Sequence, residues 1–191
     1  MKRLKVCVEK LGLELKTKPT ALLIKDRELE DQNPIFIFDL DQTTINSEHR
    51  VGHGSLTSWV RNSTRENIMN DELMFLSQFI GILNNVGFQV IVCTSSVLGK
   101  DDWEFLYAKM YLPSDVKVIH RHEGDTREPN LYKKERLSYL ANFKQYSNKI
   151  KILIDDNSDV RKSFRELGRN CKLLIIAKKS FANKSASTGS A

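Results

Sequence analysis

Residues 35–44, with the sequence IFIFDLDQTT, are the stretch from which the rest of the chain can be interpreted. The four apolar residues lack the apolar–polar alternation of a half-buried strand, so they indicate a strand that is buried on both faces. Asp39 and Asp41 follow directly and are separated by one residue. Side chains two positions apart in a strand project from the same face, and two like charges held that close need a cation or a shared proton. Such a pair can also be a simple acidic turn, so its meaning depends on the segments that follow.

Four further strands and four helices are predicted downstream, and they alternate along the chain. The strands are expected at residues 88–93, 116–119, 150–154 and 172–176. The helices are expected from Asn70 or Asp71 to Gly87, from Asp101 to Pro113, over 131–143, and from Ser158 or Asp159 to Gly168. Strands that alternate with helices predict a parallel sheet with right-handed crossovers, which is an α/β fold of three layers.

The length of 191 residues predicts one domain with short additions at its ends. Residues 34–179 form the expected domain, and residues 1–33 form an N-terminal extension whose two short apolar runs could pair as a β-hairpin. The tail at 180–191 is rich in Ser, Ala and Lys and is expected to be disordered. Residues 43–70 are polar and are expected to be irregular. They are too few for a large cap domain, so a site at the end of the first strand should be open.

Composition limits the class of protein. The chain carries 30 Lys and Arg against 24 Asp and Glu, a net charge of +6 that favours a polyanionic partner. Its cysteines, Cys7, Cys93 and Cys171, have no CxxC spacing, which fits a reducing compartment and argues against a disulfide framework or a zinc site. No apolar run reaches about 18 residues, so a cytoplasmic protein without a membrane span is expected.

Polar residues follow several of the buried strands, where the ends of parallel strands converge. They are Asp39 and Asp41 after the first strand, Thr94 and Ser95 after the second, Asp155 and Asp156 after the fourth, and Lys133 near the start of a helix. Several carboxylates in one pocket favour a hard divalent cation such as Mg²⁺. Hydroxyls and a lysine beside that cation suit a bound anion, so the set predicts phosphoryl transfer.

The ordered motifs resemble those of the haloacid dehalogenase (HAD) superfamily of phosphatases. The first motif, four apolar residues and DxDxT, matches residues 35–43, and the strand that ends in Thr or Ser matches residues 90–94. The motif lysine matches Lys133, and the strand that ends in an acidic pair matches residues 152–156. The resemblance implies a HAD-like Rossmannoid fold over residues 34–177.

The resemblance also implies roles for these residues. Asp39 would be the nucleophile that forms an aspartyl-phosphate, and Asp41 would be the general acid and then the general base. Lys133 and Thr94 would contact the phosphoryl group, although a threonine at a strand end can be only a helix cap. Mg²⁺ would be held by four carboxylates, although an adjacent acidic pair can also only cap a helix. These carboxylates are Asp39, Asp41, Asp155 and Asp156.

A narrower resemblance is to the 3′-phosphatase domain of bacteriophage polynucleotide kinase/phosphatase. Residues 121–127, RHEGDTR, are similar to a segment upstream of its motif lysine, and Arg50 matches an arginine nine residues after its second aspartate. The chain departs from that pattern at Ser96, where the phage enzyme has arginine, and it has no GxxxxGK[ST] segment. Substrate contacts are implied for Thr94, Ser95, Arg50, Arg127 and Lys133, with a surface salt bridge as the alternative for Arg50, Arg121 and Arg127.

The predicted function is a Mg²⁺-dependent phosphatase that acts on polynucleotide 3′ ends or on nucleotides in the cytoplasm, which would be the host cytoplasm for a phage protein. Two alternatives stay open. The first is a phosphatase of a small free phosphoester such as a nucleoside monophosphate, which the absence of arginine at Ser96 favours. The second is an inactive module that only binds phosphorylated ends.

Overall fold

The computed structural model describes residues 34–51, 56–167 and 171–174, and its centre is a five-stranded parallel sheet. The strand order is β5-β4-β1-β6-β7. The bounds are β1 (Ile35–Phe38), β4 (Gln89–Val97), β5 (Lys117–Arg121), β6 (Lys151–Ile154) and β7 (Cys171–Leu174). The expected N-terminal hairpin and the tail lie outside the described residues, as does the end of the domain that was predicted to reach residue 179.

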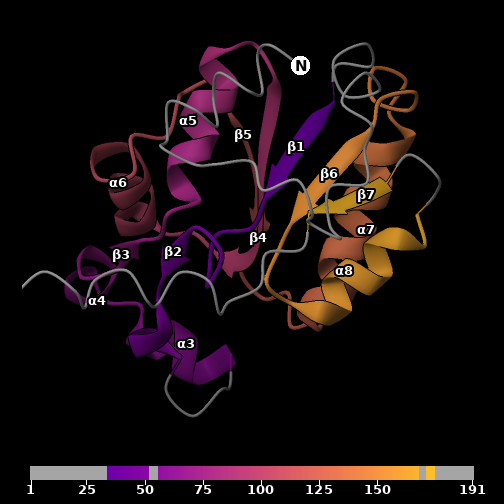
Figure 1. The fold of residues 1–191 in the computed structure, drawn as a ribbon. Helices are drawn as coiled ribbons and strands as arrows, with labels where there is room; N and C mark the ends of the chain where they lie inside the picture. Colours follow the sequence, from indigo (N-terminus) through magenta and orange to yellow (C-terminus); the bar gives the residue numbers. More distant parts are fainter. Residues whose placement is uncertain (1–33, 52–55, 168–170, 175–191) are drawn as a thin grey trace, which may run out of the picture.

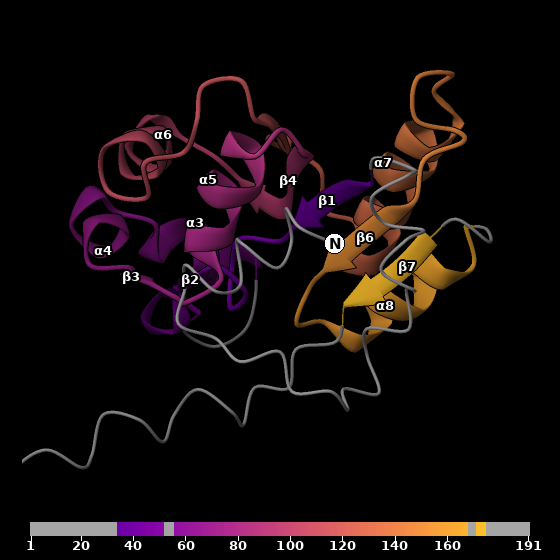
Figure 2. The same ribbon diagram turned by 45° about the horizontal axis from the view of Figure 1, so that its top comes forward.

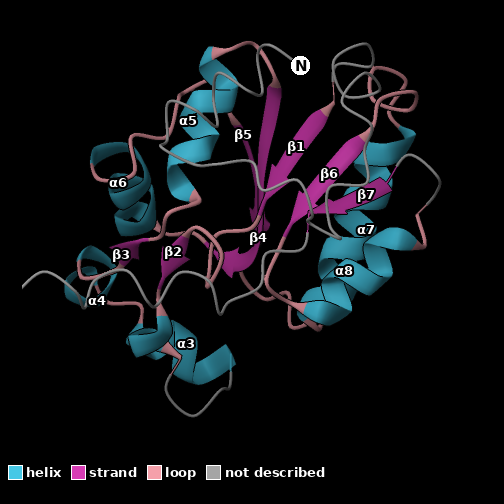
Figure 3. Cartoon of the chain, in the orientation of Figure 1, coloured by secondary structure: helices cyan, strands magenta, loops and turns pink. Residues whose placement is uncertain are grey.

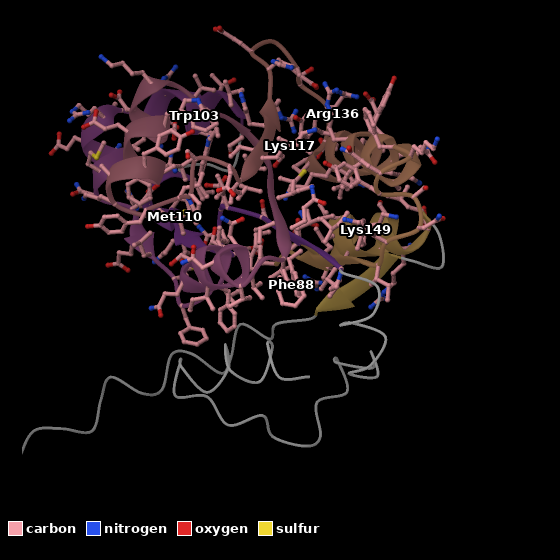
Figure 4. The ribbon with its side chains drawn as sticks, turned by 90° about the horizontal axis from the view of Figure 1, so that it is seen from above. Phe88, Trp103, Met110, Lys117, Arg136 and Lys149 are labelled. Atoms are coloured by element: carbon pink, nitrogen blue, oxygen red, sulfur yellow. The ribbon has the colours of Figure 1, made fainter. Side chains whose placement is uncertain are left out.

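Helices cover both faces of this sheet, so the predicted three-layer α/β architecture is confirmed (Figures 1 and 2). One face carries α5 (Ser77–Asn85) and α6 (Lys100–Ala108), and the other carries α7 (Pro129–Asn142) and α8 (Ser158–Arg165). Figure 4 looks along the sheet and shows Trp103 and Met110 on the α6 side and Arg136 on the opposite side.

Each face of the sheet has its own apolar core because successive side chains of a strand alternate between faces. Phe36 and Phe38 of β1 pack with residues of α5 and α6, whereas Ile35 and Ile37 pack with residues of α7 and α8. All four side chains are buried, which explains the continuous apolar run of the sequence.

Strand β1 lies between β4 and β6 in parallel register, with Ile37 opposite Ile91 of β4 and Leu153 of β6. The chain leaves β1 toward β4 and β5 and then returns across the sheet to β6 and β7. The order therefore reverses between β1 and β6, and α/β folds bind ligands beyond the carboxyl ends of the strands at such a point.

Two predicted boundaries differ from the structure. Strand β4 continues past residue 93 to Val97, and its register with β5 shifts between Cys93 and Val97. The helix expected from Asn70 or Asp71 begins only at Ser77. Asp71 does not cap a helix because its carboxylate pairs with an arginine of the preceding segment, and Leu73, expected in the buried stripe, lies in β3 and is 46% exposed.

The segment expected to be irregular between β1 and α5 is instead a small folded insert (Figure 3). Strands β2 (Ile45–Asn46) and β3 (Glu72–Leu73) pair in antiparallel orientation. Between them lie the 3₁₀ helix η1 (Glu48–Arg50) and the helices α3 (Leu56–Asn62) and α4 (Arg65–Met69). The described residues of this insert form no large cap domain. None of the described helices has the length and apolar character that a membrane span requires.

Candidate active site

Lys133 joins two buried carboxylates where β1 and β6 end. Its Nζ lies 2.7 Å from Asp39 Oδ1 and 2.7 Å from Asp155 Oδ2. Asp39 follows β1 directly, and its backbone N–H donates to the carbonyl of Ile154, the last residue of β6, at 3.0 Å. The second turn of α7 supplies the lysine, and its neighbour Lys134 points instead to Glu166 on the exposed surface. The strand ends therefore bring together residues that are far apart in the sequence.

Asp156 completes this group, which we call the Lys133 cluster and which consists of Asp39, Lys133, Asp155 and Asp156. Carboxylate oxygens of the three aspartates all lie within 4.8 Å of one another. Thr43 connects both sides of the cluster, because its Oγ1 accepts the Asp156 N–H at 3.0 Å and lies 3.4 Å from oxygens of Asp39 and Asp156.

The electrostatics of the cluster favour an additional cation. Burial raises the pKa of Asp39 well above its ordinary value; Lys133 opposes that rise, and the nearby Asp155 and Asp41 add to it. Burial acts to lower the pKa of Lys133, but its two carboxylate partners raise that pKa overall. The negative charge of three carboxylates exceeds what one lysine balances. Hard oxygen ligands in this number fit Mg²⁺, so Asp39, Asp155 and Asp156 could hold it.

Asp41 has a different environment, although only one residue separates it from Asp39. Its carboxylate accepts hydrogen bonds from three hydroxyls: Ser47 at 2.9 Å, Thr94 at 3.2 Å and Ser96 at 2.6 Å. We call these four residues the Asp41 cluster. Among the described residues, the group of carboxylates that could share a metal ion does not include Asp41. The structure thus brings three of the four predicted metal ligands together and places the fourth beside hydroxyls.

A tight turn separates the two aspartates. The N–H groups of Thr44 and Ile45 donate to the carbonyl of Leu40, and the N–H of Gln42 donates to the carbonyl of Ile45. Gln42 has φ of 60°, in the left-handed region that non-glycine residues rarely occupy. Such backbone strain is found at functional sites, where the surrounding structure imposes it. Here it lies in the turn that directly follows Asp41.

In the structure, the hydrogen bonds of Thr94 and Ser95 join them to Asp41, Ser96 and Arg121, and not to the Lys133 cluster. Thr94 is fully buried, donates to Asp41 and accepts the N–H of Ser96 at 3.0 Å. The carbonyl of Ser95 accepts a hydrogen bond of 2.5 Å from Nε of Arg121. Both residues therefore fix the end of β4 around Asp41.

Arg127 and Arg121 also make protein contacts. Arg127 donates to Asp125 Oδ2 at 2.5 Å and to Glu135. Arg121 is buried and donates to the carbonyls of Asp125 and Arg127, so it holds this loop against the end of β4. Arg127 thus pairs with carboxylates on a partly exposed surface, whereas Arg121 is buried and bonded mainly to backbone carbonyls.

Arg50 is buried and forms ion pairs with acidic residues. Its Nε and Nη2 donate to the two oxygens of Asp71 at 3.0 and 2.6 Å, a bidentate pair. Its Nη1 lies 3.5 Å from Asp102 Oδ1, and its Nη2 lies 3.7 Å from Asp41 Oδ1. Only 3% of its side chain is exposed, and these contacts are with groups of the protein.

Sequence reasoning missed several residues of the site. They are Thr43, Ser47, Asp71 and Asp102, together with Ser96 as a partner of Asp41. Thr43 belongs to the first motif, so its position was a usable signal. The remaining four carry no local signal, because their contacts join segments that lie between 6 and 55 residues apart in the chain.

The comparisons with known proteins place the chain in a family. The family model of the bacteriophage T5 5′-deoxynucleotidase matches residues 29–172, the larger part of the sequence and nearly all of the described fold. A hydrolase from Streptococcus pneumoniae TIGR4, known from its crystal structure, has 14% sequence identity and a TM-score of 0.48, over 71% of this chain and 89% of that one. Among curated proteins there is no match. The chain belongs to the bacteriophage T5 5′-deoxynucleotidase family.

Proposed function

We propose that this protein is a Mg²⁺-dependent phosphatase that hydrolyses 5′-deoxynucleoside monophosphates through an aspartyl-phosphate at Asp39. The observation that carries the proposal is Lys133, whose Nζ lies 2.7 Å from both Asp39 and Asp155, with Asp156 close by. A lysine among carboxylates suits a site that must accept an anionic phosphate next to an anionic nucleophile. The family match supports the nucleotide substrate.

The metal site of this proposal consists of Asp39, Asp155 and Asp156, the three carboxylates that approach one another. When bound there, Mg²⁺ would supply positive charge that screens the phosphate from the nucleophile and stabilises charge on the phosphoryl oxygens. Lys133 would add a second positive charge on the same side and would hold the Asp39 carboxylate in one orientation.

The first step of the proposed reaction is attack by an Asp39 oxygen on phosphorus. The bond between phosphorus and the 5′ oxygen breaks, and that oxygen takes a proton from Asp41, so the deoxynucleoside leaves as an alcohol. In the second step water attacks the phosphorus of the aspartyl-phosphate and gives a proton to Asp41. Inorganic phosphate leaves, and both carboxyl groups return to their starting states.

The nucleotide is favoured over a polynucleotide 3′ end as substrate for two reasons. The matching family is named for an enzyme of 5′-deoxynucleotides. Ser96, at the position where the polynucleotide enzyme has arginine, donates to Asp41, and Arg50 is buried against Asp71. The chain therefore lacks one arginine of the polynucleotide enzyme, and the counterpart of the other, Arg50, contacts protein groups instead. Because the family is named for a bacteriophage enzyme, the proposed place of action is the cytoplasm of the host.

Phosphate release tests the proposal. The substrates are 5′-deoxynucleoside monophosphates, the corresponding 3′-monophosphates, 5′-ribonucleotides and an oligonucleotide with a 3′ phosphate, each with and without Mg²⁺. We expect the highest kcat/KM on 5′-deoxynucleotides and no turnover without a divalent cation. A higher kcat/KM on the 3′-phosphorylated oligonucleotide would contradict the proposed 5′-deoxynucleotide substrate. Absence of turnover on every phosphoester, with retained binding, would favour the inactive binding module.

A further inference from the structure

We propose that Arg50 is a positioning residue for Asp41, the general acid of the proposed reaction, and that it does not bind the substrate phosphate. This inference rests on the proposed function and adds to it a residue that acts through another residue. The observations that carry it are the burial of Arg50, its ion pairs and hydrogen bonds with other described residues, and its place between the insert and the active site.

The donors of Arg50 are directed at protein groups. Two nitrogens hold Asp71 in a bidentate pair, and the third donates to Ser63 Oγ at 3.3 Å and lies 3.5 Å from Asp102. A bidentate arginine pair has fixed geometry and is stronger than a simple hydrogen bond. Its guanidinium carbon also lies 4.6 Å from the ring centroid of Trp59, so one face of the group is covered. To grip phosphate, Arg50 would have to break these contacts.

The partners of Arg50 come from separate elements of the fold. Asp71 precedes β3, Asp102 lies on α6, Trp59 lies on α3, and Asp41 follows β1. Asn62, the last residue of α3, donates to the carbonyl of Arg50 at 3.2 Å. One guanidinium therefore joins the small insert to the layered domain, and it does so directly beside Asp41.

The charges explain why the position of Asp41 depends on this group. Asp41, Asp71 and Asp102 all lie within 3.7 Å of Arg50 and line the same small pocket with it. Burial raises the pKa of Asp71 to about 6 even though Arg50 opposes the rise. Without the guanidinium, three carboxylates would face one another in a poorly solvated space. Asp41 is the most exposed of them, so it can move away most readily, and it would then leave its hydrogen bonds with Ser47 and Ser96.

Two substrates with different leaving groups distinguish a positioning role of Arg50 from a phosphate-binding role. Departure of a nucleoside from phosphate requires protonation of a poor leaving group, whereas p-nitrophenolate departs without it. A displaced general acid should therefore slow release of the deoxynucleoside in a single turnover and spare release of p-nitrophenolate, because hydrolysis of the aspartyl-phosphate comes later and is common to both substrates. Loss of a phosphate contact should raise KM for both substrates.

The experiment compares the full-length wild type with Arg50→Lys, Asp71→Asn, Asp41→Asn and the control Arg65→Lys. Arg65 is an exposed arginine of the same insert that pairs with Glu104 and Asp101, away from the catalytic groups. Thermal melts accompany the kinetics of every variant. Asp71→Asn removes one charge of the pair without touching Arg50, so it tests the same network if Arg50→Lys does not fold.

We expect Arg50→Lys to slow the single-turnover release of the deoxynucleoside about 10- to 100-fold, with less than about 3-fold change in the single-turnover release of p-nitrophenolate and in the KM for either substrate. Asp71→Asn should change the same ratio in the same direction, and Arg65→Lys should not. Equal losses on both substrates, or a raised KM with unchanged kcat, would overturn the inference alone, provided that Asp41→Asn keeps its preference for the good leaving group. If Asp41→Asn shows no such preference, the acid role in the proposed function fails, and the inference fails with it.

Discussion

Asp39 and Asp41 are separated by one residue, but they belong to halves of the site with opposite character. Asp39 lies in the Lys133 cluster, whose other members come from α7 and from the segment that directly follows β6. Asp41 lies in the Asp41 cluster, whose partners are hydroxyls from β4 and from the insert. One half offers a lysine and three carboxylates for a cation and a phosphate, and the other offers neutral donors around a single acid.

The comparison indicates that the position of β1 in the sheet determines which partners Asp39 and Asp41 contact. Strand β1 lies between β6 and β4, so the chain that leaves it can direct one aspartate to each neighbour. The proposed reaction, with a nucleophile and a separate proton donor, would use two aspartates that have different partners.

Removal of each carboxylate in turn should give the largest effects, and it tests whether Asp39 and Asp41 have separate roles. We expect Asp39→Asn to lower kcat/KM on a 5′-deoxynucleotide by more than about 10⁴-fold, because no nucleophile remains. Asp41→Asn should cost about 10²- to 10⁴-fold, the usual contribution of a general acid. Phosphate release measures both, with thermal melts as the check of folding. Equal losses on every substrate from the two variants would mean that the aspartates do not have separate roles.

Metal binding should depend on one half of the site only. Chelation should abolish turnover, and added Mg²⁺ should restore it. Mg²⁺ should also stabilise the wild type, by about 2.7 kcal/mol at a concentration of one hundred times Kd. Asp156→Asn should weaken that stabilisation, whereas Ser96→Ala should retain it, since Ser96 contacts Asp41. Loss of metal stabilisation in Ser96→Ala, with Asp156→Asn unaffected, would reverse the assignment of the halves.

Lys133 and Lys134 provide a matched pair for stability. Lys133→Met leaves Asp39 and Asp155 buried without their cation, which should cost about 3–5 kcal/mol of unfolding free energy. Lys134 pairs with Glu166 on the surface, so Lys134→Met should change stability by less than about 1 kcal/mol. Urea unfolding without metal measures both. Mg²⁺ should recover part of the loss in Lys133→Met, and a loss as small as that of Lys134→Met would contradict the proposed charge balance.

The pocket around Arg50 should make stability depend on pH. Burial raises the pKa of Asp71 from its usual 3.8 to about 6; Arg50 and His49 oppose the rise, and Asp41 adds to it. A carboxyl whose pKa is higher in the folded state binds more protons there, so it stabilises at low pH, and this contribution is lost as the pH rises from about 4 to about 6. Relative to Asp71→Asn, the wild type should lose about 1–2 kcal/mol over that range. Urea unfolding at pH 4 and pH 7 measures the difference, and a difference that does not change with pH would contradict the assignment.

The Lys133 half could be predicted from the sequence to a large extent. Its aspartates follow continuous apolar runs, residues 35–38 and 152–154, and such runs indicate buried strands whose ends meet in a parallel sheet. The relative order of the motifs then selected Lys133. In this half the backbone alone determines most of the geometry.

The Asp41 half could not be predicted, because long-range polar contacts organise it. The insert has short helices and two-residue strands, and its buried centre is a charged group, Arg50, with no apolar periodicity around it. The pairing of Arg50 with Asp71 also removed the expected helix cap and displaced the start of α5 to Ser77. A local pattern cannot predict a partner that is 21 residues away or, for Ser96 and Asp41, 55 residues away.

The most direct measurement is to trap the phosphorylated enzyme. Acid-quenched enzyme that is turning over a 5′-deoxynucleotide can be reduced with borohydride, which converts an aspartyl-phosphate to homoserine, and the peptide that spans β1 and the following turn can then be sequenced by mass spectrometry. The account predicts homoserine at position 39 and unmodified aspartate at position 41, and Asp39→Asn should show no modification. Homoserine at position 41, or none at either position while turnover proceeds, would contradict it.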